Sequence, residues 1–244
     1  MIADGLHFSA ATARTIATTK FILSGLTLRL PLVLMNGVVV YDPISEKFIK
    51  VHTLPPENTE AVIRVLKEHG VSGLMYEIKD SVQRTYYETL EHEPIREFVE
   101  ERITRYKKKF IHAESFSDIP PGEIVYFTLL DTLERLQPVY EALSALPGIN
   151  IVMYNNNYNE AYWLLEVHSG KAGKKSAVDY LRKTLGYEVV VGFGDNLNDL
   201  PMFEACDIKV AVENAKPEVK AAADYICGRN EDDGVVRWML FERI

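Results

Sequence analysis

Residues 188–199 read EVVVGFGDNLND, an apolar run followed at once by a polar turn. The run predicts a strand over 188–193 that is covered on both faces, as in a parallel sheet. A short helix is expected over 200–205, which places the turn at the carboxyl end of a parallel strand. Open α/β sheets bind their ligands at that edge. The stretch therefore predicts a doubly wound α/β fold with a functional site at this turn.

The turn itself carries oxygen ligands. Asp195 and Asp199 are four residues apart, close enough to share one hard cation, and Asn198 can add an oxygen or orient Asp199. Carboxylates, an amide oxygen and water suit Mg²⁺. The alternative is an Asn/Asp-rich turn that only caps the next helix. We favour the metal site and assign Asp195, Asp199 and Asn198 to it.

A second candidate lies near the N-terminus. Leu6 to Ala11 is a short apolar run that predicts a buried strand, and Thr12 and Ala13 follow it. A hydroxyl and free backbone amides at the end of a strand can hold a phosphoryl oxygen. A threonine cap on the next helix explains the same residues equally well.

A third candidate is Lys174, which opens a helix predicted over 174–185 between Gly173 and Gly186. Helix N-termini attract anions, and a lysine there adds a positive charge. Lys171 and Lys175 are rivals by spacing, and a solvated lysine is the common alternative.

The remaining pattern predicts three segments, a parallel core in two pieces over 1–52 and 168–244 and an α+β insert over 53–167. In the first piece a strand signal, VVVY, follows the turn pair Asn36-Gly37. The insert is expected to form paired strands with helices on one face. Its elements are helices over 57–69, 94–109 and 132–146 and strands over 71–78, 123–130, 149–155 and 161–167.

Composition narrows the class of partner. The formal net charge of −8 disfavours a general nucleic-acid binder, and no apolar run approaches the length of a membrane span. The two cysteines, Cys206 and Cys227, form no metal-binding pattern and are expected to be buried thiols in a reducing cytosol. We expect a cytoplasmic protein with a small-molecule partner. The sequence does not indicate the oligomeric state.

These motifs together resemble a known family. Thr12, Lys174 and GDNLND (194–199) occur in the order and contexts of motifs two, three and four of the haloacid dehalogenase superfamily. The resemblance to its Cof-type branch, which carries a type-2 cap domain between motifs two and three, extends over nearly the whole chain. Four further segments carry it: NGVVVYD at 36–42, LLEVHSGKAGKKSA at 164–177, VAVENAKPEVKAAAD at 210–224 and EDDGV at 231–235.

The resemblance implies a Rossmann-like core with an inserted α+β cap, and a Mg²⁺-dependent phosphohydrolase that works through an aspartyl phosphate. The metal would be held by Asp195 and Asp199, with Asn198 beside them. Thr12 and Lys174 would be the catalytic groups that bind phosphoryl oxygens. The other implied positions are Ala13 and Asn198 on the phosphate, and Asn36, Gly37 and Asn214 in the pocket.

One family motif, DxDGT at the end of the first strand, is absent. Asp4-Gly5 does not replace it, because no apolar strand precedes it and no second aspartate follows two residues later. In the family fold that strand lies between the strands ending at Thr12 and Asp195, so its loss would leave unpaired ladder groups. We expect the full gene product to begin about 30 residues earlier and the chain as given to lack turnover.

The substrate class remains open within this resemblance. A sugar phosphate or a phosphorylated cofactor fits, and so do a phosphomutase and a non-catalytic remnant that binds a phosphorylated ligand. Cap residues Tyr76, Tyr154, Asn155 and Tyr158 are candidate lining groups, although half-buried sheet residues would show the same pattern.

Overall fold

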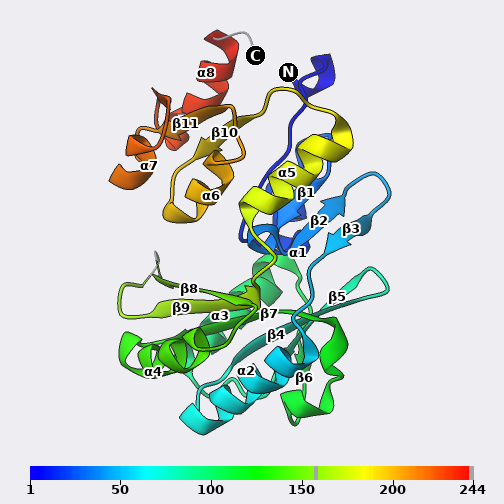
Figure 1. Ribbon diagram of the computed structural model, residues 1–244, viewed down its shortest axis with the longest axis vertical. Helices are drawn as coiled ribbons and strands as arrows, with labels where there is room; N and C mark the ends of the chain where they lie inside the picture. Colours follow the sequence, from blue (N-terminus) through cyan, green and yellow to red (C-terminus); the bar gives the residue numbers. More distant parts are fainter. Residues whose placement is uncertain (157–158, 242–244) are drawn as a thin grey trace. The chain divides into compact units, whose positions relative to one another are not determined.

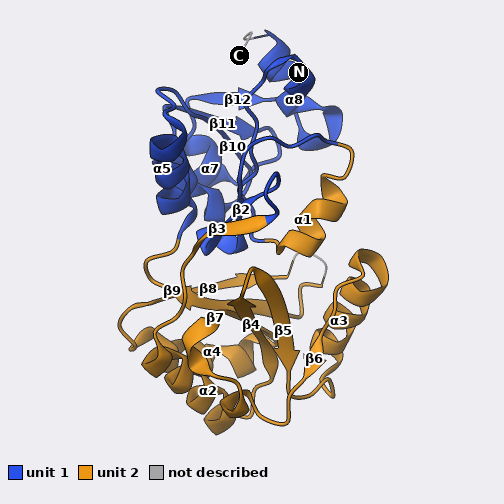
Figure 2. Ribbon diagram, turned by 90° about the vertical axis from the view of Figure 1, so that its right-hand side faces the viewer, with its two compact units in different colours: residues 1–13, 26–46, 173–244 blue, residues 14–25, 47–172 orange. Residues whose placement is uncertain are grey.

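The computed structural model describes residues 1–156 and 159–241. The chain forms two compact units (Figure 2). Unit 1 combines Met1–Ala13, Leu26–Glu46 and Gly173–Ile244, and unit 2 combines Arg14–Gly25 and Lys47–Ala172. Each unit is described separately below, and the three-segment domain boundaries expected from the sequence stay a prediction.

Unit 1 contains a parallel sheet in the order β10-β11-β12 (Figure 1). This confirms the parallel strand that the apolar run before the GDNLND turn predicts. Connecting helices alternate with the strands, as expected of a doubly wound fold. The strands are β10 (Val191–Gly194), β11 (Ile208–Val212) and β12 (Tyr225–Cys227), and the helices are α5 (Lys174–Leu185), α6 (Leu200–Phe203), α7 (Pro217–Ala221) and α8 (Gly234–Phe241).

The apolar face of this sheet packs against α6 and α7. Val210, Ala211 and Val219 are completely buried there, and Met202 and Phe203 of α6 join the same cluster. The cysteines Cys206 and Cys227 are free and buried, as expected. Burial of such side chains is the main favourable term in folding, so the strand end that carries the GDNLND turn is held on a rigid base.

A hairpin forms the second part of unit 1. Its antiparallel strands are β1 (Leu32–Leu34) and β2 (Val39–Asp42), joined by the 3₁₀ turn Met35–Gly37. Asn36 has φ 55° and Gly37 has φ 90°, so the predicted turn pair does reverse the chain. Both residues belong to a buried stretch that runs from Pro31 to Tyr41.

The strand predicted over 6–11 is wrong. Only Ala11 forms a bridge, parallel to Val33, supported by the bonds Val33 N–H to Ala10 C=O (2.9 Å) and Thr12 N–H to Val33 C=O (2.9 Å). A buried strand needs ladder partners along its length. Among the described residues this segment has a partner on one side only and over one residue, so it runs as an extended loop.

Unit 2 is built on a six-stranded sheet in the order β6-β5-β4-β7-β9-β8. All its pairs are antiparallel except β5 with β6. The strands are β4 (Gly73–Lys79), β5 (Val82–Tyr87), β6 (Ile111–His112), β7 (Ile124–Asp131), β8 (Ile149–Asn155) and β9 (Trp163–Ser169), and β3 (Lys47–Val51) precedes them. This architecture agrees with the predicted α+β insert.

Helices cover both faces of this sheet. Those on one face are α2 (Pro56–His69) and α4 (Leu133–Ser144), whose apolar residues form the main core with Met75, Phe127 and Leu165. The helix α3 (Glu93–Tyr106) contacts β7 and α1 (Ile16–Ile22) but adds nothing to that core. The expectation that the helices gather on one face therefore holds for α2 and α4 and is wrong for α3. No described helix is both long enough and apolar enough to cross a membrane.

Candidate active site

The GDNLND turn is ordered by its own aspartate. Asp199 Oδ2 accepts the backbone N–H groups of Asp195 (3.0 Å) and Asn196 (3.2 Å), and the turn continues into a 3₁₀ segment, Leu197–Asp199. Asp199 therefore caps the turn in the way that an acidic residue caps a helix start. This capping function, which the sequence offered as the alternative to a metal site, is present.

The second oxygen of Asp199 meets Lys174. Lys174 Nζ lies 2.5 Å from Asp199 Oδ1, and the two side chains are only 4% and 8% exposed. A charge-assisted bond of this length between buried groups is strong, because water does not screen it. The prediction that Lys174, rather than its rivals, belongs beside the turn is supported by this contact, since Lys175 pairs with the exposed Glu204 instead.

Asp195 is electrostatically different from Asp199. Burial by its neighbours and the negative charge of Asp199 raise the pKa of the Asp195 carboxyl, and Lys174 opposes this only in part. Asp195 is exposed, and none of the ion pairs among the described residues involves it. The turn thus carries an accessible carboxylate with no cationic side chain against it.

Thr12 is connected to the same region through the hairpin. Asn36 donates its backbone N–H to the Thr12 carbonyl (3.0 Å), and its side-chain Oδ1 accepts a bond from Asn198 Nδ2 (3.3 Å). Ala13 follows in the bend that ends the first segment of unit 1. The structure therefore places Thr12, Asn36 and Asn198 in one chain of contacts, although they are far apart in sequence.

Gly37 has a packing function. A Cβ built on it would collide with the carbonyl of Gly173 and lie 2.8 Å from Lys174 N. The hairpin turn therefore lies directly against the first residues of α5. Only glycine allows this approach at φ 90°, so Gly37 fixes where Lys174 begins its helix.

Sequence reasoning missed two supporting residues. Asn196 Oδ1 accepts the N–H of Leu197 (2.8 Å), and the Lys216 N–H donates to the Asp195 carbonyl (2.9 Å). Asn214, a predicted pocket residue, accepts the N–H of Asn230 through its side chain (3.2 Å). The bonds made by Lys216 and Asn214 join loops across long sequence separations, and nothing in residue spacing indicates them.

The residues at the turn fit a divalent cation. Asp195 offers a carboxylate that has no ion pair among the described residues, and the bond from Asn198 Nδ2 to Asn36 leaves the Asn198 amide oxygen as a metal ligand. Two oxygen donors of this kind suit Mg²⁺, which keeps several waters. Among the described residues no three His, Cys, Asp or Glu side chains gather, so the acidic part of this site consists of the two turn aspartates.

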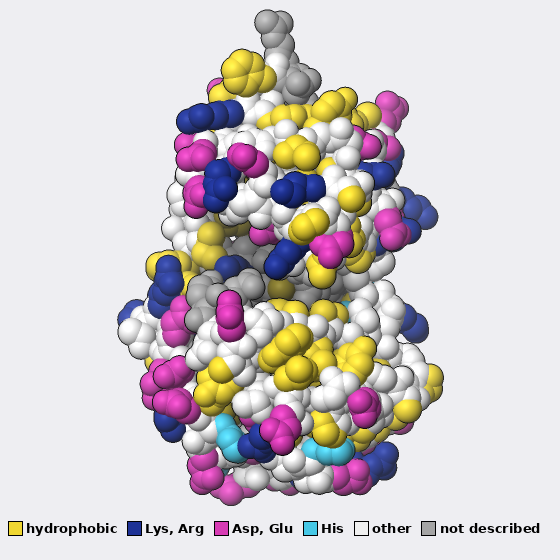
Figure 3. All heavy atoms as spheres, turned by 90° about the vertical axis from the view of Figure 1, so that its left-hand side faces the viewer, with side chains coloured by type: hydrophobic (Ala, Val, Ile, Leu, Met, Phe, Trp, Pro, Cys, Tyr) yellow, Lys and Arg dark blue, Asp and Glu magenta, His cyan; other side chains and the backbone are white. Residues whose placement is uncertain are grey.

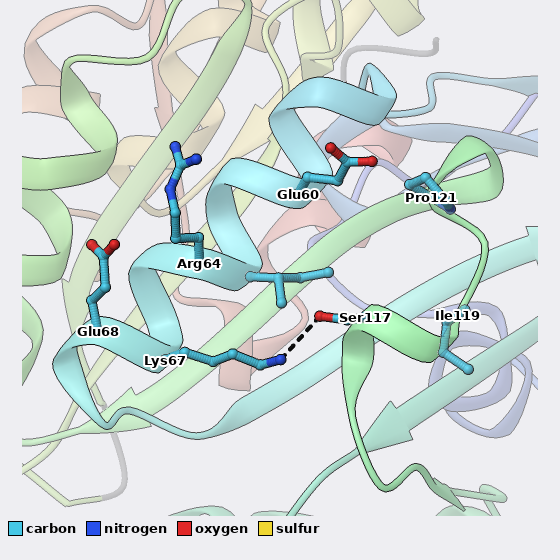
Figure 4. A pocket seen from close by; sticks show the side chains of 8 residues that line it. Glu60, Arg64, Lys67, Glu68, Ser117, Ile119 and Pro121 are labelled. Carbon is cyan, nitrogen blue, oxygen red and sulfur yellow. Dashed lines mark hydrogen bonds between the residues drawn. The ribbon is translucent and has the colours of Figure 1, made fainter.

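Acidic and basic side chains are intermixed over the face shown in Figure 3. A hollow of about 430 Å³ on unit 2 is lined by α2 and residues 117–121 (Figure 4). Its Lys67 donates to Ser115 (2.8 Å) and Ser117 (2.9 Å). This hollow shares no residue with the candidate active site.

Comparisons with known proteins identify relatives. The family model described as haloacid dehalogenase-like hydrolase matches residues 1–239. The chain is 25% identical over 245 residues to the 5-amino-6-(5-phospho-D-ribitylamino)uracil phosphatase YitU of Bacillus subtilis, covering 97% of this chain and 84% of the relative. It is 26% identical over 231 residues to the pyridoxal phosphate phosphatase YbhA of Escherichia coli, covering 88% and 78%. The crystal structure of a Thermotoga maritima protein matches with a TM-score of 0.77 at 26% identity, covering 100% and 86%.

Proposed function

Because the chain belongs to the family of haloacid dehalogenase-like hydrolases, we propose that it is a Mg²⁺-dependent phosphatase of small phosphorylated metabolites. A ribityl phosphate, pyridoxal phosphate or a sugar phosphate represents the substrate class, because the relatives are named for the first two. The observation that carries the proposal is the Lys174–Asp199 pair beside the exposed carboxylate of Asp195.

Each residue has a proposed function in this chemistry. Asp195 and the amide oxygen of Asn198 would hold Mg²⁺, which supplies positive charge against the phosphate. Asp199 would add negative charge to attract the cation and would hold Lys174 in place. Both of its carboxylate oxygens already accept hydrogen bonds, so Asp199 could bind the metal directly only through an oxygen that also accepts one of these bonds. Lys174, Thr12 and the Ala13 amide would bind phosphoryl oxygens.

The nucleophile is the remaining requirement. An aspartyl-phosphate mechanism needs an attacking aspartate, and the 244 residues contain no Asp-x-Asp pair. We therefore propose that the 244-residue chain binds phosphorylated ligands but does not turn them over. A chain extended by a strand–helix segment carrying DxDGT would hydrolyse them.

The test is a phosphate-release assay on both chains, with Mg²⁺ and with EDTA. Pyridoxal phosphate, the ribityl phosphate and hexose phosphates serve as substrates. The extended chain should release phosphate only with Mg²⁺, and Asp195→Asn and Lys174→Met should each remove most of that activity. Lys175→Met, which alters an exposed lysine on the same helix, should not. An extended, folded chain that is inactive on every substrate, or active in EDTA, would count against the proposal.

The missing Asp-x-Asp pair also favours a second candidate, a protein that only binds phosphorylated ligands. Calorimetry on the unextended chain separates the two functions. If both chains bind hexose phosphate with the same affinity and neither releases phosphate, the second candidate is the better description.

A further inference from the structure

The face of the unit 2 sheet that points away from α2 and α4 carries a row of polar groups among apolar side chains such as Leu74 and Leu130. Side chains alternate along a strand, so the neighbours of the core residues Met75, Phe127 and Leu165 point to this opposite face. Those neighbours are Tyr76, Thr128 and Glu166, which are 3%, 4% and 5% exposed. Thr128 pairs with Glu166 across β7 and β9, and hydrogen bonds join Tyr76 to Thr128 and Tyr154 to Glu166. A connected row of hydroxyl and carboxylate groups thus crosses four strands.

Lys108 lies over this row. The helix α3 ends at Lys107, which adopts the left-handed conformation (φ 54°), and the Lys108 N–H returns to the Arg102 carbonyl (3.1 Å). Lys108 Nζ lies 4.6 Å from the ring centroid of Tyr76 and 4.9 Å from that of Phe110. The residue is only 8% exposed. The end of α3 therefore delivers a lysine into a nearly closed aromatic site.

The amine of Lys108 lies against two aromatic rings. Among the described residues, none of the ion pairs or hydrogen bonds involves it. The charged group that acts on it most is Arg102, which has the same sign, and burial with this repulsion lowers the pKa of Lys108 to about 7. Buried charges are normally paired, and Arg102 has its own ion pair with Glu101 (3.0 Å), so the buried ammonium of Lys108 is the group that an anion would stabilise.

We propose that Lys108 and Arg102, above Tyr76, form a ligand site for the carboxylate of a small polyhydroxylated molecule. The carboxylate would lie between the two cations, where guanidinium and ammonium groups both donate to it. The hydroxyls of the ligand would meet Tyr154 and Glu166, where the Tyr154 hydroxyl already donates a hydrogen bond to the Glu166 carboxylate. The Arg102 side chain is 21% exposed and gives access from solvent. This site lies wholly within unit 2 and goes beyond the proposed phosphatase activity.

Ligand binding at this site should be coupled to protonation of Lys108, which would not be seen if Lys108 had only a structural function. Bound carboxylate favours the charged amine, so the pKa of Lys108 rises on binding, protons are taken up near pH 7 to 9, and affinity falls as pH rises in that range. Burial raises the pKa of Tyr76 and of Tyr154, so neither tyrosine loses a proton in that range. The charged or titratable groups that face the amine or its cationic neighbour are Arg102 from α3, Tyr76 from β4, Tyr154 from β8, Glu166 from β9 and, towards Arg102, Glu101, Tyr106 and Arg14.

The experiment uses the full chain labelled with [ε-¹³C]lysine and two probes, D-gluconate and D-sorbitol. NMR follows the Lys108 signal, assigned by its loss in Lys108→Arg. We expect gluconate to bind at least tenfold more tightly than sorbitol at pH 6.5, to raise the Lys108 pKa by at least one unit, and to lose this preference by pH 9. Lys108→Met should lose the preference at every pH, whereas Lys108→Arg should keep it at pH 9.

Two controls locate the effect. Lys107→Met alters the exposed neighbour, and Lys174→Met alters the lysine of the candidate active site; both should leave the gluconate preference unchanged. Equal binding of the two probes, an unchanged Lys108 pKa at saturating gluconate, or a preference that survives in Lys108→Met would each overturn the proposal. If Lys108→Met fails to fold, the pKa of wild-type Lys108 with and without gluconate decides. Failure here leaves phosphate release untouched, so the two proposals are tested separately.

Discussion

Replacing Asp199 by asparagine should destabilise unit 1 far more than an ordinary charge removal. The change keeps the shape of the side chain and one acceptor for the amides of Asp195 and Asn196. The Lys174 amine, whose side chain is 4% exposed, then faces the amide N–H₂ or the weakly accepting amide oxygen of asparagine, where the wild type has a carboxylate oxygen at 2.5 Å. Removing one partner of a buried ion pair costs about 3–5 kcal/mol. We expect a loss of this size in the free energy of unfolding.

The reverse change should cost less. Lys174→Met leaves Asp199 charged, but Asp199 keeps two backbone N–H donors at 3.0 and 3.2 Å. A loss of about 1–3 kcal/mol is expected, as for a buried group that loses one of its hydrogen bonds. The double variant leaves neither charge without its partner. Its loss in the free energy of unfolding should therefore be smaller than the sum of the two single losses, by about 1–3 kcal/mol.

The assay is urea denaturation followed by tryptophan fluorescence, because Trp238 packs on Phe193 of β10 and reports on unit 1. With a slope of about 1–3 kcal/mol per molar urea, a loss of 3 kcal/mol moves the midpoint by about 1 M or more. Lys175→Met is the matched control: its pair with Glu204 is 49% and 63% exposed and should matter by less than about 0.5 kcal/mol. The reasoning is refuted if Asp199→Asn costs no more than this control, or if the double variant is simply additive.

Three further results are expected. Gly37→Ala should destabilise unit 1 by several times the ~1 kcal/mol typical of a point change, because its Cβ collides with the Gly173 carbonyl; a melting curve within 2–3 °C of wild type, on the order of 1 kcal/mol, would contradict this. Mg²⁺ titrated by calorimetry should bind wild type but not Asp195→Asn, while circular dichroism stays unchanged; equal binding by both would remove Asp195 from the site. Lys108 has a folded-state pKa of about 7, below its unfolded value, so the unfolded chain binds more protons between pH 7 and 10 and stability should rise with pH there; in Lys108→Met this part of the slope should vanish.

The sequence predicted best those elements whose ends are chemically marked. The helix over 174–185 was placed correctly because Gly173 and Gly186 bound it, and Gly186 adopts the left-handed conformation that ends helices. The hairpin of β4 and β5 was missed, because its turn uses Asp80 and Ser81 at φ 51° and 59° where a glycine or asparagine would have marked it. Residues 6–11 were wrongly predicted as a strand, because apolar character indicates burial and says nothing about whether ladder partners are present.

The candidate site was predictable in its members but not in their contacts. The GDNLND turn can be identified from residue type and position, since it lies at the end of a strand, whereas only the family resemblance distinguishes Lys174 from Lys171 and Lys175. That Asp199 would turn one oxygen to Lys174 and the other to the amides of its own loop depends on side-chain direction across 25 residues. Hydrophobic periodicity carries no such information, so the different contacts of Asp195 and Asp199 could be assigned only from the three-dimensional structure.

Each unit contains a buried lysine, and the two lysines differ in how their charge is paired. In unit 1, Lys174 is matched by Asp199, so the pair is neutral as a whole and a phosphoryl group would meet an amine whose orientation is already fixed. In unit 2, Lys108 is buried to nearly the same extent but faces two rings and a like-charged Arg102. Contact with aromatic faces stabilises an ammonium by about 0.5–2 kcal/mol, which offsets only part of the cost of burying it. An arriving anion would offset the rest, so the lack of an ion pair to Lys108 among the described residues is the feature that selects a negatively charged ligand.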